Sequence, residues 1–118
     1  MKVIITGGGG FLGSQLATTL LDHGKLTGPS GGQEPIEEIM LIDARFVIPQ
    51  NDPRVQQIVG DISNRDVIDE AIGSAKNISI FHLASMVSGE CEERYDDALR
   101  VNLDGGRNIF EAARAVAS

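Results

Sequence analysis

A glycine cluster that directly follows a short apolar run constrains the fold of this chain more than any other feature. The run covers residues 3–6, and an amphipathic helical pattern begins after the glycines. The spacing Gly7-x-x-Gly10-x-x-Gly13 suits a nucleotide pyrophosphate. The first glycine permits a sharp turn, the second lets the main chain approach the phosphates, and the third lets the helix pack close to the strand. Amides at the helix start would face the anion. A lone glycine triplet could also be a tight turn that binds nothing.

The composition of the chain limits which binding partners and which cellular location we expect. The chain has 118 residues, enough for one domain with a hydrophobic core. Its net charge is −7 and no basic stripe stands out, so nucleic acid and anionic membranes are poor candidates for partners. The single cysteine, Cys91, excludes an intrachain disulfide and favours a cytoplasmic location. His23 and His82 lack the spacing of metal ligands, and we expect no metal site.

Apolar runs alternate with helical patterns along the chain. We expect strands at 2–6, 38–43, 55–59 and 78–83, helices at 11–23, from 63 to about 75 and from about 88 onward, and a loop at 25–35. Strands separated by helices pair in parallel through right-handed crossovers. The order therefore predicts an α/β fold with a Rossmann-type doubly wound parallel sheet of about four strands, in the spatial order 3-2-1-4.

An acid stands where the second predicted strand ends. Asp43 could accept hydrogen bonds from the adenosine ribose of a dinucleotide, or it could be an ordinary loop acid. Its distance from the glycines exceeds the usual spacing of about 20 residues, and the Gly/Pro-rich loop at 25–35 accounts for the excess. A carboxylate here would repel a 2′-phosphate and so favours NAD. Arg45 could pair with that phosphate, which leaves NADP open.

Two further strand ends carry polar or small residues. Asp61 follows the third strand and could accept a hydrogen bond from the adenine amine while Ile62 packs on the ring, or it could only begin the turn into the next helix. After the fourth strand, the small residues of the segment 82–85 would let the middle of a dinucleotide pass over the strand end. We interpret His82 as structural.

These motifs stand in the order seen in the extended short-chain dehydrogenases/reductases, also called the NAD-dependent epimerase/dehydratase family. The chain resembles that family over nearly its whole length, through Thr6-Gly7-x-x-Gly10-x-x-Gly13, Asp43, Gly60-Asp61-Ile62, His82-Leu83-Ala84 and Val101-Asn102-x-x-Gly105. Gly106 departs from it, since the family commonly has threonine there, and this weakens helix propensity by roughly 0.5–1 kcal/mol. Residues 35–36, 52–55, 81–89 and 100–105 are most similar to members that oxidise a four-carbon sugar acid.

The resemblance implies that NAD is the cofactor and that it is held along the strand ends. The pyrophosphate would lie on the glycine turn and the first helical amides, the ribose on the acid after the second strand, the adenine on the segment after the third strand, and the nicotinamide on the end of the fourth. The implied cofactor-binding residues are Gly7, Gly10, Phe11, Leu12, Gly13, Asp43, Asp61, Ile62, Leu83, Ala84, Ser85 and Asn102, the last as much a backbone brace as a ligand.

The catalytic pair of the family is not found in this chain. Family chemistry rests on a tyrosine four residues before a lysine, but here Tyr95 is followed at that spacing by Leu99. We therefore expect no catalytic residue within residues 1–118, which would form the N-terminal part of the NAD-binding domain and be inactive alone. The implied parent is an NAD-dependent oxidoreductase of carbohydrate metabolism, acting on a small sugar acid or a related alcohol.

Two other functions stay open on the sequence: a nucleotide-sugar epimerase or dehydratase, and a dinucleotide-binding module without catalysis. The predicted sheet also leaves the outer edge of its fourth strand unpaired. We therefore expect either self-association through that edge or cover from a missing remainder. Members of the resembled family often dimerise through the helix expected from about residue 88, so a homodimer is the default expectation.

Overall fold

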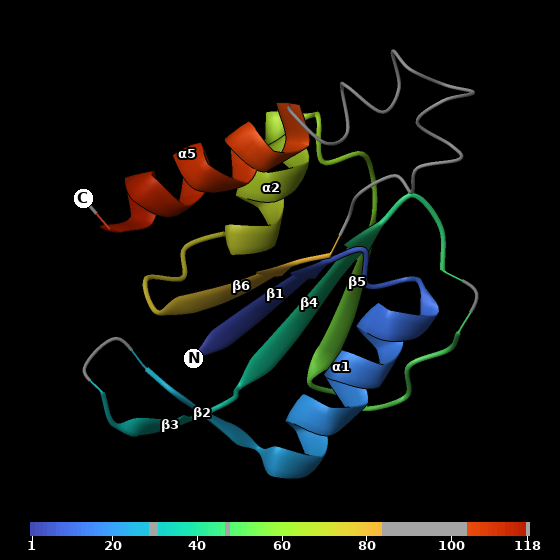
Figure 1. The fold of residues 1–118 in the computed structure, drawn as a ribbon, viewed down its shortest axis with the longest axis vertical. Helices are drawn as coiled ribbons and strands as arrows, with labels where there is room; N and C mark the ends of the chain where they lie inside the picture. Colours follow the sequence, from blue (N-terminus) through green and yellow to red (C-terminus); the bar gives the residue numbers. More distant parts are fainter. Residues whose placement is uncertain (29–30, 47, 84–103, 118) are drawn as a thin grey trace.

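A parallel sheet is the frame of the fold. The computed structural model describes residues 1–28, 31–46, 48–83 and 104–117 (Figure 1). Its elements in chain order are β1 (Lys2–Thr6), α1 (Phe11–His23), β2 (Lys25–Thr27), β3 (Gln33–Pro35), β4 (Glu38–Asp43), β5 (Val55–Val59), α2 (Arg65–Ile72), β6 (Ile78–His82) and α5 (Gly105–Ala117). The helix expected from about residue 88 lies outside the described residues up to residue 103.

The order of the four long strands confirms the predicted doubly wound topology. The sheet runs β5-β4-β1-β6, and each neighbouring pair is parallel. Thr6 at the end of β1 pairs with Ile42 on one side and His82 on the other. The chain steps outward from β1 to β4 and β5 and then returns to the other side of β1. The carboxyl ends of the strands thus meet at one edge, where ligands of such sheets bind.

Helices cover both faces of the sheet and make a three-layer α/β structure, with α1 on one side and α2 and α5 on the other (Figure 1). Val3, Ile4 and Ile5 of β1 are fully buried, because alternate residues of a strand point to opposite faces and both faces are covered here. The layer with α1 contains Val3, Ile5, Ala17, Leu20, Ile39 and Leu41. The other layer contains Ile4, Met40, Ile42, Ile62, Ile68, Ala71, Ile109 and Ala112.

The segment expected as a loop at 25–35 is instead a small β-hairpin, and this expectation was wrong. β2 and β3 pair antiparallel as a separate two-stranded sheet, with Leu26 opposite Glu34. The Gly28 amide donates to the Gly32 carbonyl at 2.8 Å, and Gly31 has a φ of 87°. Glycines that looked like loop residues therefore serve the hairpin turn.

Single residues determine where α1 ends and where α2 begins. Gly24 ends α1 in the left-handed conformation, with a φ of 80°, as its sequence position predicts. α2 begins one residue later than expected: Asn64, and not Ser63, is the N-cap, and its side chain accepts a hydrogen bond from the Asp66 amide at 3.0 Å.

The outer side of β6 carries an apolar groove under α5. Among the described residues β6 has a neighbouring strand only on the β1 side. The groove has a volume of about 560 Å³, and it is lined by Lys76, Ile78, Ile80, His82, Gly106, Ile109, Phe110, Ala113 and Val116. Phe110 is 79% exposed beside it. Within the described part of the chain, no helix is long and apolar enough to cross a membrane.

Candidate functional site

The glycine turn has the geometry that its spacing predicts. Gly7 has a φ of 76°, which a residue with a side chain rarely adopts. A Cβ at Gly13 would lie 2.5 Å from the Gly7 carbonyl oxygen, so the helix packs directly on the turn. A Cβ at Gly10 would meet nothing nearer than 3.7 Å among the described residues. The open side of the turn at Gly10 is therefore where a ligand can approach the main chain.

Gly8 and Gly9 also have to be glycine, although the triplet spacing leaves both positions free. A Cβ at Gly8 would lie 2.7 Å from the Leu41 Cβ atom, and a Cβ at Gly9 would lie 2.1 Å from the Arg45 carbonyl oxygen. The amides of Gly7 and Gly8 both donate to the Ile42 carbonyl, at 2.8 and 3.1 Å. The turn is thus pressed against the end of β4.

Asp43 is joined to the glycine turn by its carboxylate. Oδ2 accepts a hydrogen bond from the Gly9 amide at 2.9 Å, and Oδ1 accepts one from the Ala44 amide at 2.7 Å. The acid is thereby brought beside the turn from a position 34 residues further along the chain. Arg45 next to it is exposed. The predicted ribose-binding acid and the predicted pyrophosphate turn are therefore in direct contact.

The start of α1 presents main-chain amides together with two exposed apolar side chains. Gly10 is the N-cap and has no side chain to satisfy the first helical amides, and the first turn contains no acid. Such amides have no acceptor within the helix and favour an anion. Phe11 and Leu12 are 73% and 66% exposed. This end of the helix fits a phosphate group flanked by apolar parts of a ligand.

The segment after β5 forms a tight turn into α2. Asp61 Oδ1 accepts a hydrogen bond from the Ser63 amide at 2.9 Å, and the Asp61 carbonyl accepts one from the Asn64 amide at 2.9 Å. The Ile62 side chain is only 4% exposed and belongs to the core under α5. A ligand contact by Ile62 would therefore come from its main chain, while Asp61 has an only partly buried side chain at the surface of the turn.

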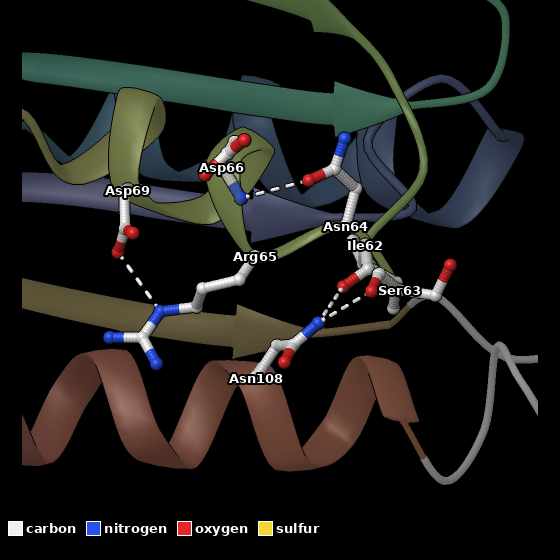
Figure 2. A network of polar contacts seen from close by, with 7 residues as sticks. All are labelled: Ile62, Ser63, Asn64, Arg65, Asp66, Asp69 and Asn108. Atoms are coloured by element: carbon white, nitrogen blue, oxygen red, sulfur yellow. Dashed lines mark hydrogen bonds and ion pairs between the residues drawn. The ribbon is translucent and has the colours of Figure 1, made fainter.

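Asn108 of α5 holds this same segment from the other side, as Figure 2 shows. Its Nδ2 atom donates to the carbonyl oxygens of Ile62 and Ser63, each at 2.9 Å. The sequence reasoning missed Asn108, because its acceptors are main-chain groups that lie 46 and 45 residues away. The one signal in the sequence was a polar asparagine next to the apolar core residues of an amphipathic helix.

Thr6 and His82 meet at the point where the strand order reverses. Thr6 Oγ1 and His82 Nδ1 share a hydrogen bond of 2.6 Å, and the Leu83 amide donates to the Thr6 carbonyl at 3.1 Å. Desolvation lowers the pKa of His82 below its ordinary value, which favours the neutral ring. A neutral His82 tied to Thr6 agrees with its structural interpretation.

Some predicted residues lie outside the described part of the chain. These are Ala84, Ser85 and Asn102 among the predicted cofactor contacts, together with Cys91 and Tyr95. The structure brings Gly7, Gly10, Gly13 and Asp43 together and places Asp61 and Leu83 at neighbouring strand ends of the same sheet edge. It therefore gathers the described candidates at the carboxyl edge of the sheet.

The chain matches one family of known proteins over almost its whole length. Residues 4–117 match the sequence model of the 3-beta hydroxysteroid dehydrogenase/isomerase family. D-erythronate dehydrogenase of Cupriavidus necator is 43% identical over 116 residues, which cover 97% of this chain and 35% of that enzyme.

Two solved structures share the fold. The nucleoside-diphosphate-sugar epimerase from Agrobacterium tumefaciens is 31% identical with a TM-score of 0.70, over 95% of this chain and 32% of that one. The UDP-glucose 4-epimerase of Thermus thermophilus in complex with NAD is 25% identical with a TM-score of 0.76, over 99% of this chain and 35% of that one. The chain thus spans about a third of the length of these relatives.

Proposed function

Because the chain belongs to the extended short-chain dehydrogenase/reductase family, also called the NAD-dependent epimerase/dehydratase family, we propose that it is the NAD-binding part of a longer oxidoreductase. The observation that supports this most directly is the contact of Asp43 with the Gly9 amide at 2.9 Å. It sets a carboxylate and a main-chain anion site side by side, which is the combination that a dinucleotide requires.

In this proposal the dinucleotide runs along the carboxyl edge of the sheet. The amides of Gly10, Phe11 and Leu12 hold the pyrophosphate, and the open space at Gly10 lets it come close. Asp43 accepts from the ribose hydroxyls, and Asp61 accepts from the adenine amine. Leu83, Ala84 and Ser85 line the nicotinamide side, and Asn102 braces it. NAD, when bound, would supply the ring that takes or gives a hydride.

The same residues favour NAD over NADP. A 2′-phosphate on the adenosine ribose would approach the Asp43 carboxylate, and like charges at short range repel. The exposed Arg45 side chain would favour NADP instead, since a guanidinium can pair with a phosphate. Asp43 is held by two amide hydrogen bonds, at 2.9 and 2.7 Å, and so cannot turn away without breaking them. We therefore assign NAD.

The substrate class that we propose is a small sugar acid such as erythronate. It rests on the 43% identity with D-erythronate dehydrogenase of Cupriavidus necator. The test follows the appearance of reduced cofactor when the full-length protein is given NAD and a panel of sugar acids. Turnover of erythronate supports the assignment, and its absence beside turnover of another sugar acid or alcohol would refute it.

A second candidate is a nucleotide-sugar epimerase or dehydratase, which the fold and the 31% identity to the Agrobacterium tumefaciens epimerase favour. Both activities use the same cofactor half, and they separate in the substrate half. A third is a dinucleotide-binding module without catalysis. The sequence that follows Ser118 in the gene distinguishes the last from the others, because a Tyr-x-x-x-Lys motif there would exclude it.

We further propose a homodimer as the natural assembly and the cytoplasm as the location, the latter from the single cysteine. In the full-length protein the groove between β6 and α5 would be covered by the remainder of the same polypeptide. Its apolar lining and the exposed Phe110 support a covering segment that is itself apolar.

A further inference from the structure

We propose that Asn108 is a positioning residue for cofactor recognition: it holds the Asp61–Ser63 segment so that the Asp61 carboxylate meets the 6-amino group of adenine. The proposal rests on the proposed NAD binding and adds a residue that does not touch the cofactor. Asn108 is on α5, an element that lies far along the chain from the turn that contains the acid.

The clamp uses both hydrogens of one side-chain amide. An asparagine NH2 group has two donors, and both are satisfied here by consecutive main-chain carbonyls, of Ile62 and Ser63, at 2.9 Å each (Figure 2). Two consecutive carbonyls can point at one nitrogen only if the backbone between them is sharply turned. Asn108 therefore selects the turned conformation of this segment.

The opposite side of the turn is closed by Asp61 itself. Its Oδ1 atom accepts from the Ser63 amide at 2.9 Å, so Ser63 is held by its amide on one side and by its carbonyl on the other. The orientation of the Asp61 carboxylate is consequently tied to the position of Ser63. Moving the Ser63 carbonyl away from Asn108 would move the amide that orients the carboxylate.

The helix that carries Asn108 cannot slide to compensate. Gly105 lies one turn earlier on the same helix, and a Cβ there would be 2.5 Å from Ile62 Cδ1. Ile62 is 4% exposed and packs into the core below α5. α5 is thus seated directly on the segment, and the amide of Asn108 reaches the two carbonyls from a fixed distance.

The other polar contacts in Figure 2 are separate from this clamp. Asn64 caps α2 by accepting from the Asp66 amide at 3.0 Å, and Arg65 donates to Asp69 at 3.0 Å. Both contacts stay within α2 and its cap. Asn108 is the residue in this network that joins α5 to the turn.

The test compares NAD with nicotinamide hypoxanthine dinucleotide, in which an oxygen replaces the 6-amino group of adenine. Dissociation constants of both are measured by calorimetry with the full-length protein, as wild type, Asn108→Ala and Ile109→Val. A carboxylate that accepts from the amino group should make the wild type prefer NAD by about tenfold or more. We expect Asn108→Ala to reduce this preference to about twofold and to change the affinity for the hypoxanthine analogue by less than about threefold.

Ile109→Val is the matched control, because it removes one methyl group from the neighbouring core residue on the same helix and leaves both hydrogen bonds of Asn108 in place. It should lower the melting temperature and keep the wild-type preference. If Asn108→Ala does not fold, Asn108→Ser serves instead, since its shorter hydroxyl cannot donate to both carbonyls. An unchanged preference in the Asn108 variants, or a wild type without any preference, would overturn the inference. A wild type that binds neither dinucleotide would refute the proposed function itself.

Discussion

Replacing Gly13 by alanine separates the structural part of the glycine turn from its ligand-binding part. The added Cβ would lie 2.5 Å from the Gly7 carbonyl oxygen and 2.7 Å from Gly8 Cα, where 3.0 Å is the limit that Cβ contacts respect. Both neighbours are main-chain atoms of the turn, so neither can rotate aside. α1 would have to move away from β1.

The size of the effect follows from two opposing contributions. Overpacking of this kind costs about 1–3 kcal/mol, and the rigid main-chain neighbours of Gly13 place it in the upper half of that range. Alanine is favoured over glycine inside a helix by about 0.8–1.0 kcal/mol, which offsets part of it. We therefore expect a net loss of about 1–2 kcal/mol in the free energy of unfolding, or a melting temperature lower by about 3–8 °C.

Urea denaturation followed by circular dichroism measures this loss, and Gly10→Ala is the matched control. A Cβ at Gly10 meets only the Gly7 oxygen at 3.7 Å, and its φ of −85° and ψ of 176° suit alanine. Gly10→Ala should therefore change stability by less than about 1 kcal/mol while weakening NAD binding. Equal stabilities of Gly13→Ala and wild type would refute the close packing of α1 on the turn.

Three further predictions concern the chain outside the turn. Arg54 lowers the pKa of Asp52 to about 2 through a side-chain hydrogen bond. The ionised carboxylate therefore stabilises the fold fully at pH values above 3.8, its ordinary pKa, and this contribution is lost as the pH falls toward 2. Arg54→Ala should flatten the dependence of the urea midpoint on pH between 5 and 2, and parallel curves would contradict this. The isolated chain should self-associate through the β6 edge, and Phe110→Ser should shift it toward monomer in sedimentation velocity; a monodisperse wild-type monomer would count against the exposed groove as the cause. The isolated chain should also produce no reduced cofactor from NAD and erythronate, and measurable turnover would show that residues within it suffice for catalysis.

The sequence predicted the sheet because the signals for its strands are local. Short apolar runs, each bounded by a glycine or an acid, mark β1 and β4, and the handedness of crossovers leaves few ways to arrange the strands. The hairpin at Lys25–Pro35 was missed because its glycines are equally typical of loops. The N-cap of α2 was misplaced by one residue because Ser63 and Asn64 are both good caps, and only the fold decides which side chain reaches Asp66.

The contacts that hold the site together could not be read from the sequence, because they join distant segments. Gly8 and Gly9 must be glycine on account of Leu41 and Arg45, which approach the turn only when β4 pairs with β1. Asn108 contacts carbonyls, which every residue has and no pattern marks. Spacing and residue type can therefore predict which groups meet a ligand, while the groups that position them emerge from the fold.

Calorimetric titration of the full-length protein with NAD and NADP tests the central claim most directly. We expect NAD to bind more tightly than NADP, because a 2′-phosphate would face the Asp43 carboxylate. Asp43→Ala should weaken NAD binding by about tenfold or more, since both the ribose contact and the hydrogen bond to Gly9 are lost. Preference for NADP, or full NAD affinity in Asp43→Ala, would contradict the assignment of the strand-end acid and the glycine turn to one dinucleotide site.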